Sequence, residues 1–166
     1  MGDALWPALH RLPRGGGVIF RHYGLSLAER RTLFAQVAQV ARARRLVLVR
    51  AGAHQLGRGE AGVHNRRGRG LITFAVHDLL ELRQAERMRA DAVLISPVFT
   101  TRSHARARRL GRTGLLRLAS QTQLPVIALG GMTVARFRGL KPHGIHGWAA
   151  IDAWTTPRQK RKAVPT

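Results

Sequence analysis

Residues 94–104, Leu-Ile-Ser-Pro-Val-Phe-Thr-Thr-Arg-Ser-His, form the most informative stretch of this chain. The stretch begins as an apolar run and ends in hydroxyl groups and cations, which predicts a buried parallel strand followed by an anion-binding loop. A second apolar run at 126–129 opens into Gly-Gly-Met-Thr at 130–133, and a third at 148–151 follows Gly147. This alternation of strands, loops and helices predicts a (β/α) barrel whose last loops hold phosphate.

Composition limits the classes of protein to consider. A chain of 166 residues with 45% hydrophobic content suits one globular domain. We predict a single barrel domain over 1–157 and a basic tail over 158–166. No apolar run reaches the roughly 20 residues of a membrane span and no signal-peptide pattern is present, so we expect a cytoplasmic protein. Because the chain has no cysteine, its chemistry must come from histidine, carboxylate, hydroxyl or backbone groups.

The formal charge of +21 would ordinarily indicate a polyanionic partner such as nucleic acid. Here the basic residues are scattered and nearly all are arginine, as in the helical segment that contains Arg30, Arg31 and Arg42. We expect most of them to lie on solvated helix faces. Aromatic residues make up only 5% of the chain, too few for a base-stacking surface, so no specific nucleic-acid partner is expected.

Periodicity and capping patterns predict five helices and seven strands. Ser26-Leu27-Ala28-Glu29 has the spacing of a capping box, and Asp78 to Glu81 repeats it. Thr113 and Thr133 are predicted to cap later helices. The expected helices cover residues 3–12, 26–45, 78–89, 113–120 and 133–140. The expected strands cover residues 18–23, 46–49, 62–64, 71–76, 92–98, 126–129 and 144–152.

Seven strands that alternate with helices are compatible with a doubly wound sheet or with a barrel. The barrel is favoured because no Gly-x-Gly-x-x-Gly motif follows an early strand. The connections at 51–60 and 65–70 fall below or near the dozen residues that a parallel crossover needs. The helices that would cover these two connections are therefore expected to be trimmed away.

Three motifs resemble the thiamine phosphate synthase and TenI family: Ser-Pro-Val-Phe-Thr-Thr-Arg-Ser-His at 96–104, Val-Ile-Ala-Leu-Gly-Gly-Met at 126–132, and Gly-Trp-Ala-Ala-Ile-Asp-Ala at 147–153. The segments 61–64 and 75–77 resemble strands four and five of that family. The resemblance covers about 18–154 and is specific in the C-terminal half. It implies a TIM (β/α)8-type barrel of which this chain lacks the first strand, with trimmed helices between strands three, four and five.

The resemblance implies transfer of a pyrimidine methyl group from pyrophosphate to a thiazole phosphate, with release of pyrophosphate. Negative charge builds on the leaving pyrophosphate and must meet donors already in place. On the matching positions, Thr101, Ser103 and His104 would contact pyrophosphate, and His104 is also a candidate catalytic residue. Backbone N–H groups at Gly130, Gly131 and Gly147 would hold the thiazole phosphate. Taken singly, a loop cap and a tight turn explain these residues as well; their combination favours the anion site.

The chain departs from the family where the family holds magnesium. Family synthases carry acids after strands three and four, whereas this chain has Arg-Ala-Gly at 50–52 and Asn-Arg-Arg at 65–67. Of the polar residues in the second strand of the family, only one has a matching residue here, Arg21. Arg21 is therefore a candidate catalytic residue. No metal ligand and no certain cofactor are therefore predicted. Either Arg21, Arg50, Arg66 and Arg67 replace the charge of magnesium, or they lie on solvated loops.

Two further functions stay open. TenI-type members resemble the pattern in which His64 and His77 end strands, and they are associated with tautomerising a thiazole carboxylate phosphate. His77 would then be the catalytic acid or base, unless it only bonds to Asp78 or to backbone. A non-catalytic scaffold that binds thiamine phosphate is the third function. All three imply small phosphorylated thiazole or pyrimidine partners.

Overall fold

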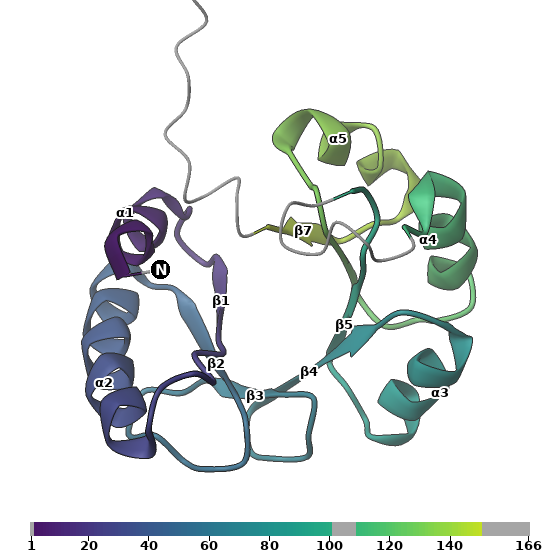
Figure 1. Ribbon diagram of the computed structural model, residues 1–166. Helices are drawn as coiled ribbons and strands as arrows, with labels where there is room; N and C mark the ends of the chain where they lie inside the picture. Colours follow the sequence, from purple (N-terminus) through teal and green to yellow (C-terminus); the bar gives the residue numbers. More distant parts are fainter. Residues whose placement is uncertain (1, 101–108, 151–166) are drawn as a thin grey trace, which may run out of the picture.

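The computed structural model of this chain describes residues 2–100 and 109–150. Its sheet has seven strands, every neighbouring pair is parallel, and the strands follow one another in sequence order. They are β1 (Gly17–Phe20), β2 (Val47–Ala51), β3 (Gly62–His64), β4 (Leu71–Val76), β5 (Ala92–Ile95), β6 (Val126–Leu129) and β7 (Gly147–Ala149). The sheet curls, and its helices lie on the outer side (Figure 1).

One helix precedes β1, and helices follow β1, β4, β5 and β6. They are α1 (Gly2–Arg11), α2 (Leu27–Arg44), α3 (Leu79–Arg87), α4 (Gly111–Ala119), α5 (Val134–Arg138) and the 3-10 helix η2 (Lys141–His143). Because β1 and β7 each pair with one neighbour only among the described residues, the sheet is a half-open barrel with seven strands of the TIM type. The predicted fold class is confirmed. None of the helices in the described ranges is long and apolar enough to cross a membrane.

The two trimmed crossovers are confirmed on either side of β3. No helix forms between β2 and β3 or between β3 and β4. In the first connection the buried side chain of Leu56 packs on the core in place of a helix. In the second, the chain returns through Gly70, whose φ is +74° and whose position would place a Cβ only 2.2 Å from the carbonyl oxygen of Ala61. Only glycine fits this close return.

The apolar core divides into two clusters at β3. One cluster joins α1 and α2 to β1 and β2 around Phe20 and Phe34, whose rings meet edge to face with centroids 5.3 Å apart. The other joins α3 and α4 to β4, β5 and β6 around Leu82 and Leu115. Each helix therefore covers its own part of the sheet, and the missing helices leave β3 between the clusters.

Three predicted helix starts are confirmed. Ser26 accepts from the N–H of Glu29 while the Glu29 carboxylate accepts from the Ser26 N–H, which is a complete capping box. Asp78 accepts from the N–H of Glu81, and Thr133 accepts from the N–H of Arg136. Each cap satisfies one of the N–H groups that a helix leaves unpaired at its start.

The predicted cap at Thr113 is wrong. Helix α4 already begins at Gly111, and its N-cap residue Leu110 makes no side-chain cap. The N–H groups of Leu110 and Gly111 instead donate to the carbonyl oxygens of Pro97 and Val98. Contacts with the segment after β5 therefore set this helix start, and local sequence does not.

Two strands end earlier than predicted. β1 ends at Phe20 rather than at residue 23 because the chain turns, with the Leu25 N–H donating to the His22 carbonyl, to reach the Ser26 cap. β5 ends at Ile95 rather than at residue 98, since Pro97 has no N–H to donate to a ladder. β7 covers Gly147–Ala149 and starts later than the predicted residue 144; residues 151 and 152 of the predicted strand lie outside the described residues.

Candidate functional site

Parallel strands place the residues that follow them at one edge of the sheet, the carboxyl edge. Arg21 follows β1, His77 follows β4, and Gly130 and Gly131 follow β6, so four of the predicted site residues share this edge. Thr101, Ser103 and His104 lie outside the described residues.

Gly147 does not join Gly130 and Gly131. It is the first residue of β7 and pairs with Ile127, inside the sheet and two residues before β6 ends. At roughly 3.3 Å per residue, its N–H lies well behind the loop that opens from Leu129. The residue of β7 in register with Leu129 is Ala149.

The loop after β6 depends on both of its glycines. Gly130 and Gly131 have φ values of +96° and +59°, a region that side chains disfavour. A Cβ on Gly130 would lie 2.9 Å from the Cα of Pro97, and one on Gly131 would lie 2.5 Å from the carbonyl oxygen of Thr100. The loop therefore packs its backbone directly on the segment that follows β5.

The N–H groups of this glycine loop have no turn or loop partner among the described residues. Among the turn and loop hydrogen bonds of the described residues, none is donated by the N–H of Gly130, Gly131 or Met132. The carbonyl of Gly130 accepts from the N–H of Phe99 at 3.1 Å, which fixes the orientation of the peptide. The side chain of Met132 is buried and holds the end of the loop in place. Successive N–H groups without a partner among the described residues suit an anion.

Arg136 is a residue of this loop region that the sequence analysis missed. Its guanidinium donates to the carbonyl oxygen of Gly131 and lies 4.4 Å from the ring centroid of Phe99. The stacking and the hydrogen bond hold a positive charge beside the glycine loop. A signal was present, because Arg136 stands three residues after the Thr133 cap, on the first turn of α5.

His77 is held by a carboxylate at the start of α3. Its Nδ1 lies 2.8 Å from Oε2 of Glu81, and the same oxygen accepts from the His77 backbone N–H at 2.6 Å. The two side chains are about half exposed. His77, Asp78 and Arg117 line an open pocket of about 400 Å³ between α3 and α4. A histidine oriented through Nδ1 presents Nε2 to a ligand.

A larger pocket, of about 590 Å³, lies at the other edge of the sheet. Residues before β6 and β7 line it, including Pro125, Val126, His143 and His146. Because the residues predicted to bind ligand follow the strands rather than precede them, this pocket does not belong to the candidate site.

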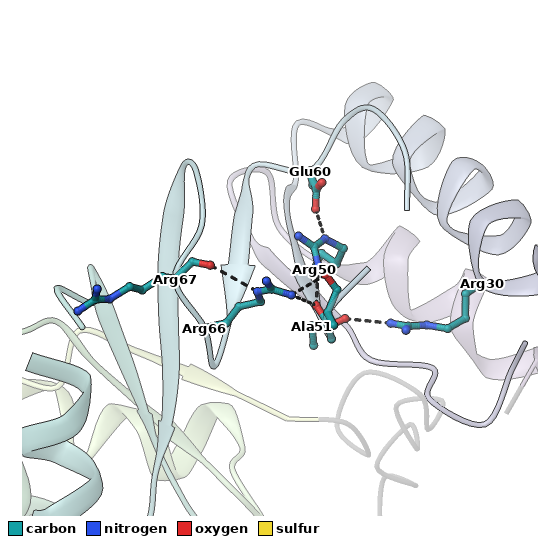
Figure 2. Close-up of polar contacts among 8 residues, drawn as sticks. Arg30, Arg50, Ala51, Glu60, Arg66 and Arg67 are labelled. Carbon is teal, nitrogen blue, oxygen red and sulfur yellow. Dashed lines mark hydrogen bonds and ion pairs between the residues drawn. The ribbon is translucent and has the colours of Figure 1, made fainter. Parts of the chain in front are cut away.

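Arginines dominate the carboxyl edge at β1, β2 and β3 (Figure 2). Arg50 ion-pairs with Glu60 and donates through Nη1 to the carbonyl oxygen of Gly52 at 2.5 Å. Nη1 of Arg66 donates to the same oxygen at 3.0 Å and to that of Ala53 at 2.6 Å. Two guanidinium groups thus lie side by side on one carbonyl.

Arg30 is an exception to the expectation that most arginines lie on solvated helix faces. Its residue is only 7% exposed, and Nη2 donates to the carbonyl of Ala51 at 2.9 Å. The guanidinium lies over the rings of Phe20 and Tyr23. Arg50 is equally buried, whereas Arg21 and Arg67 are exposed.

Two histidines near these arginines have lowered pKa values. Burial and the neighbouring charge of Arg21 lower the pKa of His64 to about 4. Nδ1 of His64 lies 3.0 Å from Oγ1 of Thr73, which fixes the ring inside the sheet. Burial and the charge of Arg30 also lower the pKa of His22. Both imidazoles are therefore neutral near pH 7.

The described residues do not fit a magnesium site. They contain no group of three histidine or acidic side chains close enough to share a metal ion. The carboxylate of Glu60 is already paired with the Arg50 guanidinium (Figure 2). Hard cations take oxygen ligands, so the donors at this edge have the wrong charge for magnesium.

Fold and site together define a class: a parallel (β/α) half-barrel with a glycine loop and a strongly cationic carboxyl edge. A sequence profile of the family described as Thiamine monophosphate synthase matches residues 12–154. The chain belongs to this family, as its motifs predicted.

Individual relatives agree with this assignment over part of their length. The thiamine-phosphate synthase of Pyrococcus furiosus is 32% identical over 94 residues, which are 57% of this chain and 45% of the relative. That of Desulfitobacterium hafniense is 36% identical over 84 residues, or 50% and 41% of the two chains. The matched regions thus span less than half the length of these curated relatives.

A solved structure shares the fold. The thiamine phosphate pyrophosphorylase from Pyrococcus furiosus superposes with a TM-score of 0.72 at 21% identity, covering 90% of this chain and 77% of that protein. At this identity the likeness concerns the arrangement of strands and helices alone.

Proposed function

We propose that this chain is a thiamine phosphate synthase-type transferase of thiamine biosynthesis, which joins a hydroxymethylpyrimidine pyrophosphate to a thiazole phosphate. The main support for this proposal is the geometry of the glycine loop after β6. Gly130 and Gly131 adopt positive φ values, pack tightly on the β5 segment and leave their N–H groups without a turn or loop partner among the described residues. Membership of the family supports the same substrate class.

The thiazole phosphate is proposed to bind on this loop. The N–H groups of Gly130 and Gly131 would donate to its oxygens, and the Arg136 guanidinium beside them would offset its charge. Gly147 is left out of this set, since its pairing with Ile127 keeps it inside the sheet.

The reaction requires charge stabilisation rather than a covalent intermediate. The bond between the pyrimidine methylene carbon and the pyrophosphate oxygen breaks, and its electron pair stays on pyrophosphate. The thiazole ring nitrogen then forms the new bond to that carbon. We assign Thr101, Ser103 and His104 to contacts with the leaving pyrophosphate. Arg21, which follows β1 at the carboxyl edge of the sheet, remains a candidate catalytic residue.

A second function, tautomerisation of a thiazole carboxylate phosphate, is favoured by one observation. The Glu81 carboxylate holds Nδ1 of His77 at 2.8 Å, beside an open pocket that also contains Arg117. This pairing sets the imidazole tautomer and offers Nε2 for proton transfer. The tautomerase needs one substrate, whereas the synthase needs two.

Product analysis separates these functions. The protein is incubated with both substrates, and thiamine phosphate and pyrophosphate are quantified by chromatography. We expect equal amounts of the two products, and we expect His77→Asn to retain this synthesis because His77 has no role in it. Tautomerisation of the thiazole alone, lost in His77→Asn, would instead assign the second function. Ligand binding without either reaction would overturn both and leave a binding scaffold.

A further inference from the structure

We infer that the carboxyl edge of β1, β2 and β3 binds a diphosphate group directly through guanidinium groups, without a divalent cation. The inference rests on the proposed function, because it concerns the diphosphate ester that the same edge would receive. It begins from the mismatch between the family's acids and the basic residues that replace them at 50–52 and 65–67.

Three guanidinium groups from different elements meet on two successive carbonyls. Arg30 from α2 donates to Ala51, while Arg50 from β2 and Arg66 from the loop after β3 both donate to Gly52. Figure 2 shows the three side chains converging on this short segment. Glu60 is the one carboxylate paired with them among the described residues. The cluster therefore carries excess positive charge.

Two buried side-chain nitrogens at this cluster lack partners among the described residues. Nε of Arg30 and Nδ1 of His22 are buried and have no hydrogen-bond partner within the described residues. Buried polar atoms are nearly always paired in folded proteins, so an unpaired set marks a place where a ligand or water completes the bonding. Arg30 is more than nine-tenths buried and is stacked on Tyr23, so its guanidinium is fixed in place.

Gly52 lets the chain pack closely against the cluster. Its φ is +92°, and a Cβ there would lie 3.2 Å from Nη1 of Arg30 and 3.3 Å from Cε1 of Tyr23. A side chain at this position would fill the space beside the guanidinium. Glycine at this position therefore allows the Arg30 guanidinium and the Tyr23 ring to pack directly on the backbone.

A diphosphate is the ligand class that matches these donors. Guanidinium groups bind phosphate oxygens through parallel N–H groups, and several of them can share one diphosphate. Like charges held side by side repel one another, and a bound anion removes this repulsion. Burial mainly lowers the pKa values of His64 and His22, and the positive charges of Arg21 and Arg30 lower them further.

The test is a calorimetric titration with inorganic pyrophosphate in the presence of EDTA, repeated with excess Mg²⁺. We expect saturable binding in EDTA that excess Mg²⁺ does not strengthen. Arg66→Gln is expected to weaken binding by about tenfold or more, since one charge-assisted contact is lost, and Arg66→Lys by less. Arg69→Gln, an exposed arginine of the same loop, is the matched control and is expected to bind normally.

The folding of each variant is checked by its circular dichroism spectrum and by its affinity for thiamine phosphate, whose phosphate belongs to the glycine loop. Pyrophosphate binding that requires Mg²⁺, or equal affinity in the Arg66 and Arg69 variants, would overturn the inference even if thiamine phosphate still binds. Failure of the wild type to bind thiamine phosphate would count against the proposed function instead.

Discussion

Gly131→Ala is expected to weaken the binding of thiamine phosphate by about a hundredfold. The new Cβ would lie 2.5 Å from the Thr100 carbonyl oxygen and 2.9 Å from Cβ of Phe99, so the loop must move. Its φ of +59° adds a cost of about 1 kcal/mol for a residue with a side chain. Displacing two charge-assisted N–H contacts costs about 3 kcal/mol, which is a hundredfold in affinity. Isothermal titration calorimetry measures this change.

Gly144→Ala is the matched control for backbone strain. Gly144 also has a positive φ, +76°, but a Cβ there would meet no atom within 4 Å. It caps η2 before β7, away from the carboxyl edge. Its affinity for thiamine phosphate is expected to equal that of the wild type. Equal affinities in all three proteins would remove the glycine loop from the binding site.

Phe34→Ala is expected to lower the free energy of unfolding by about 4 kcal/mol. Phe34 is fully buried and packs edge to face on Phe20, joining α2 to β1. No helix follows β2 or β3, so α2 is the main cover of this end of the sheet. A loss of this size is a large fraction of the stability of a typical domain. Thermal unfolding would show a midpoint lower by on the order of 10 °C.

Leu80→Ala provides the comparison for removing an apolar side chain of similar size. Leu80 lies on α3 and is 73% exposed, so its truncation leaves no cavity. Its midpoint is expected to stay within about 2 °C of the wild type. If the Phe34 and Leu80 variants unfold at the same temperature, the packing of α2 on β1 is not as described.

The sequence predicted the features that local chemistry determines. The capping box of Ser26 and Glu29 and the cap at Thr133 formed as expected, because each needs only residues three positions apart. The cap at Thr113 failed because α4 starts where Leu110 and Gly111 bond to carbonyls that follow β5. Contacts between distant segments of this kind leave no local pattern.

In the candidate site, too, local motifs could be predicted and features that depend on distant contacts could not. The glycine loop could be predicted, since a strand followed by two glycines is a local motif. The position of Gly147 could not, because it depends on the pairing of β7 with β6. Buried Arg30 was missed, although it shares the helical spacing of the buried residues Phe34, Val37 and Ala41. A charged residue on the apolar face of a helix was the available signal.

The proposed function depends on binding of a thiamine-type phosphate at the glycine loop of this half-barrel. Thermal unfolding of the protein with and without thiamine phosphate measures this binding. At about 100 times its dissociation constant, a ligand adds roughly 2.7 kcal/mol to the free energy of unfolding. We predict one cooperative transition that moves up by about 5 to 10 °C. A cooperative transition that does not move, at any ligand concentration up to the solubility limit, would contradict the proposed function.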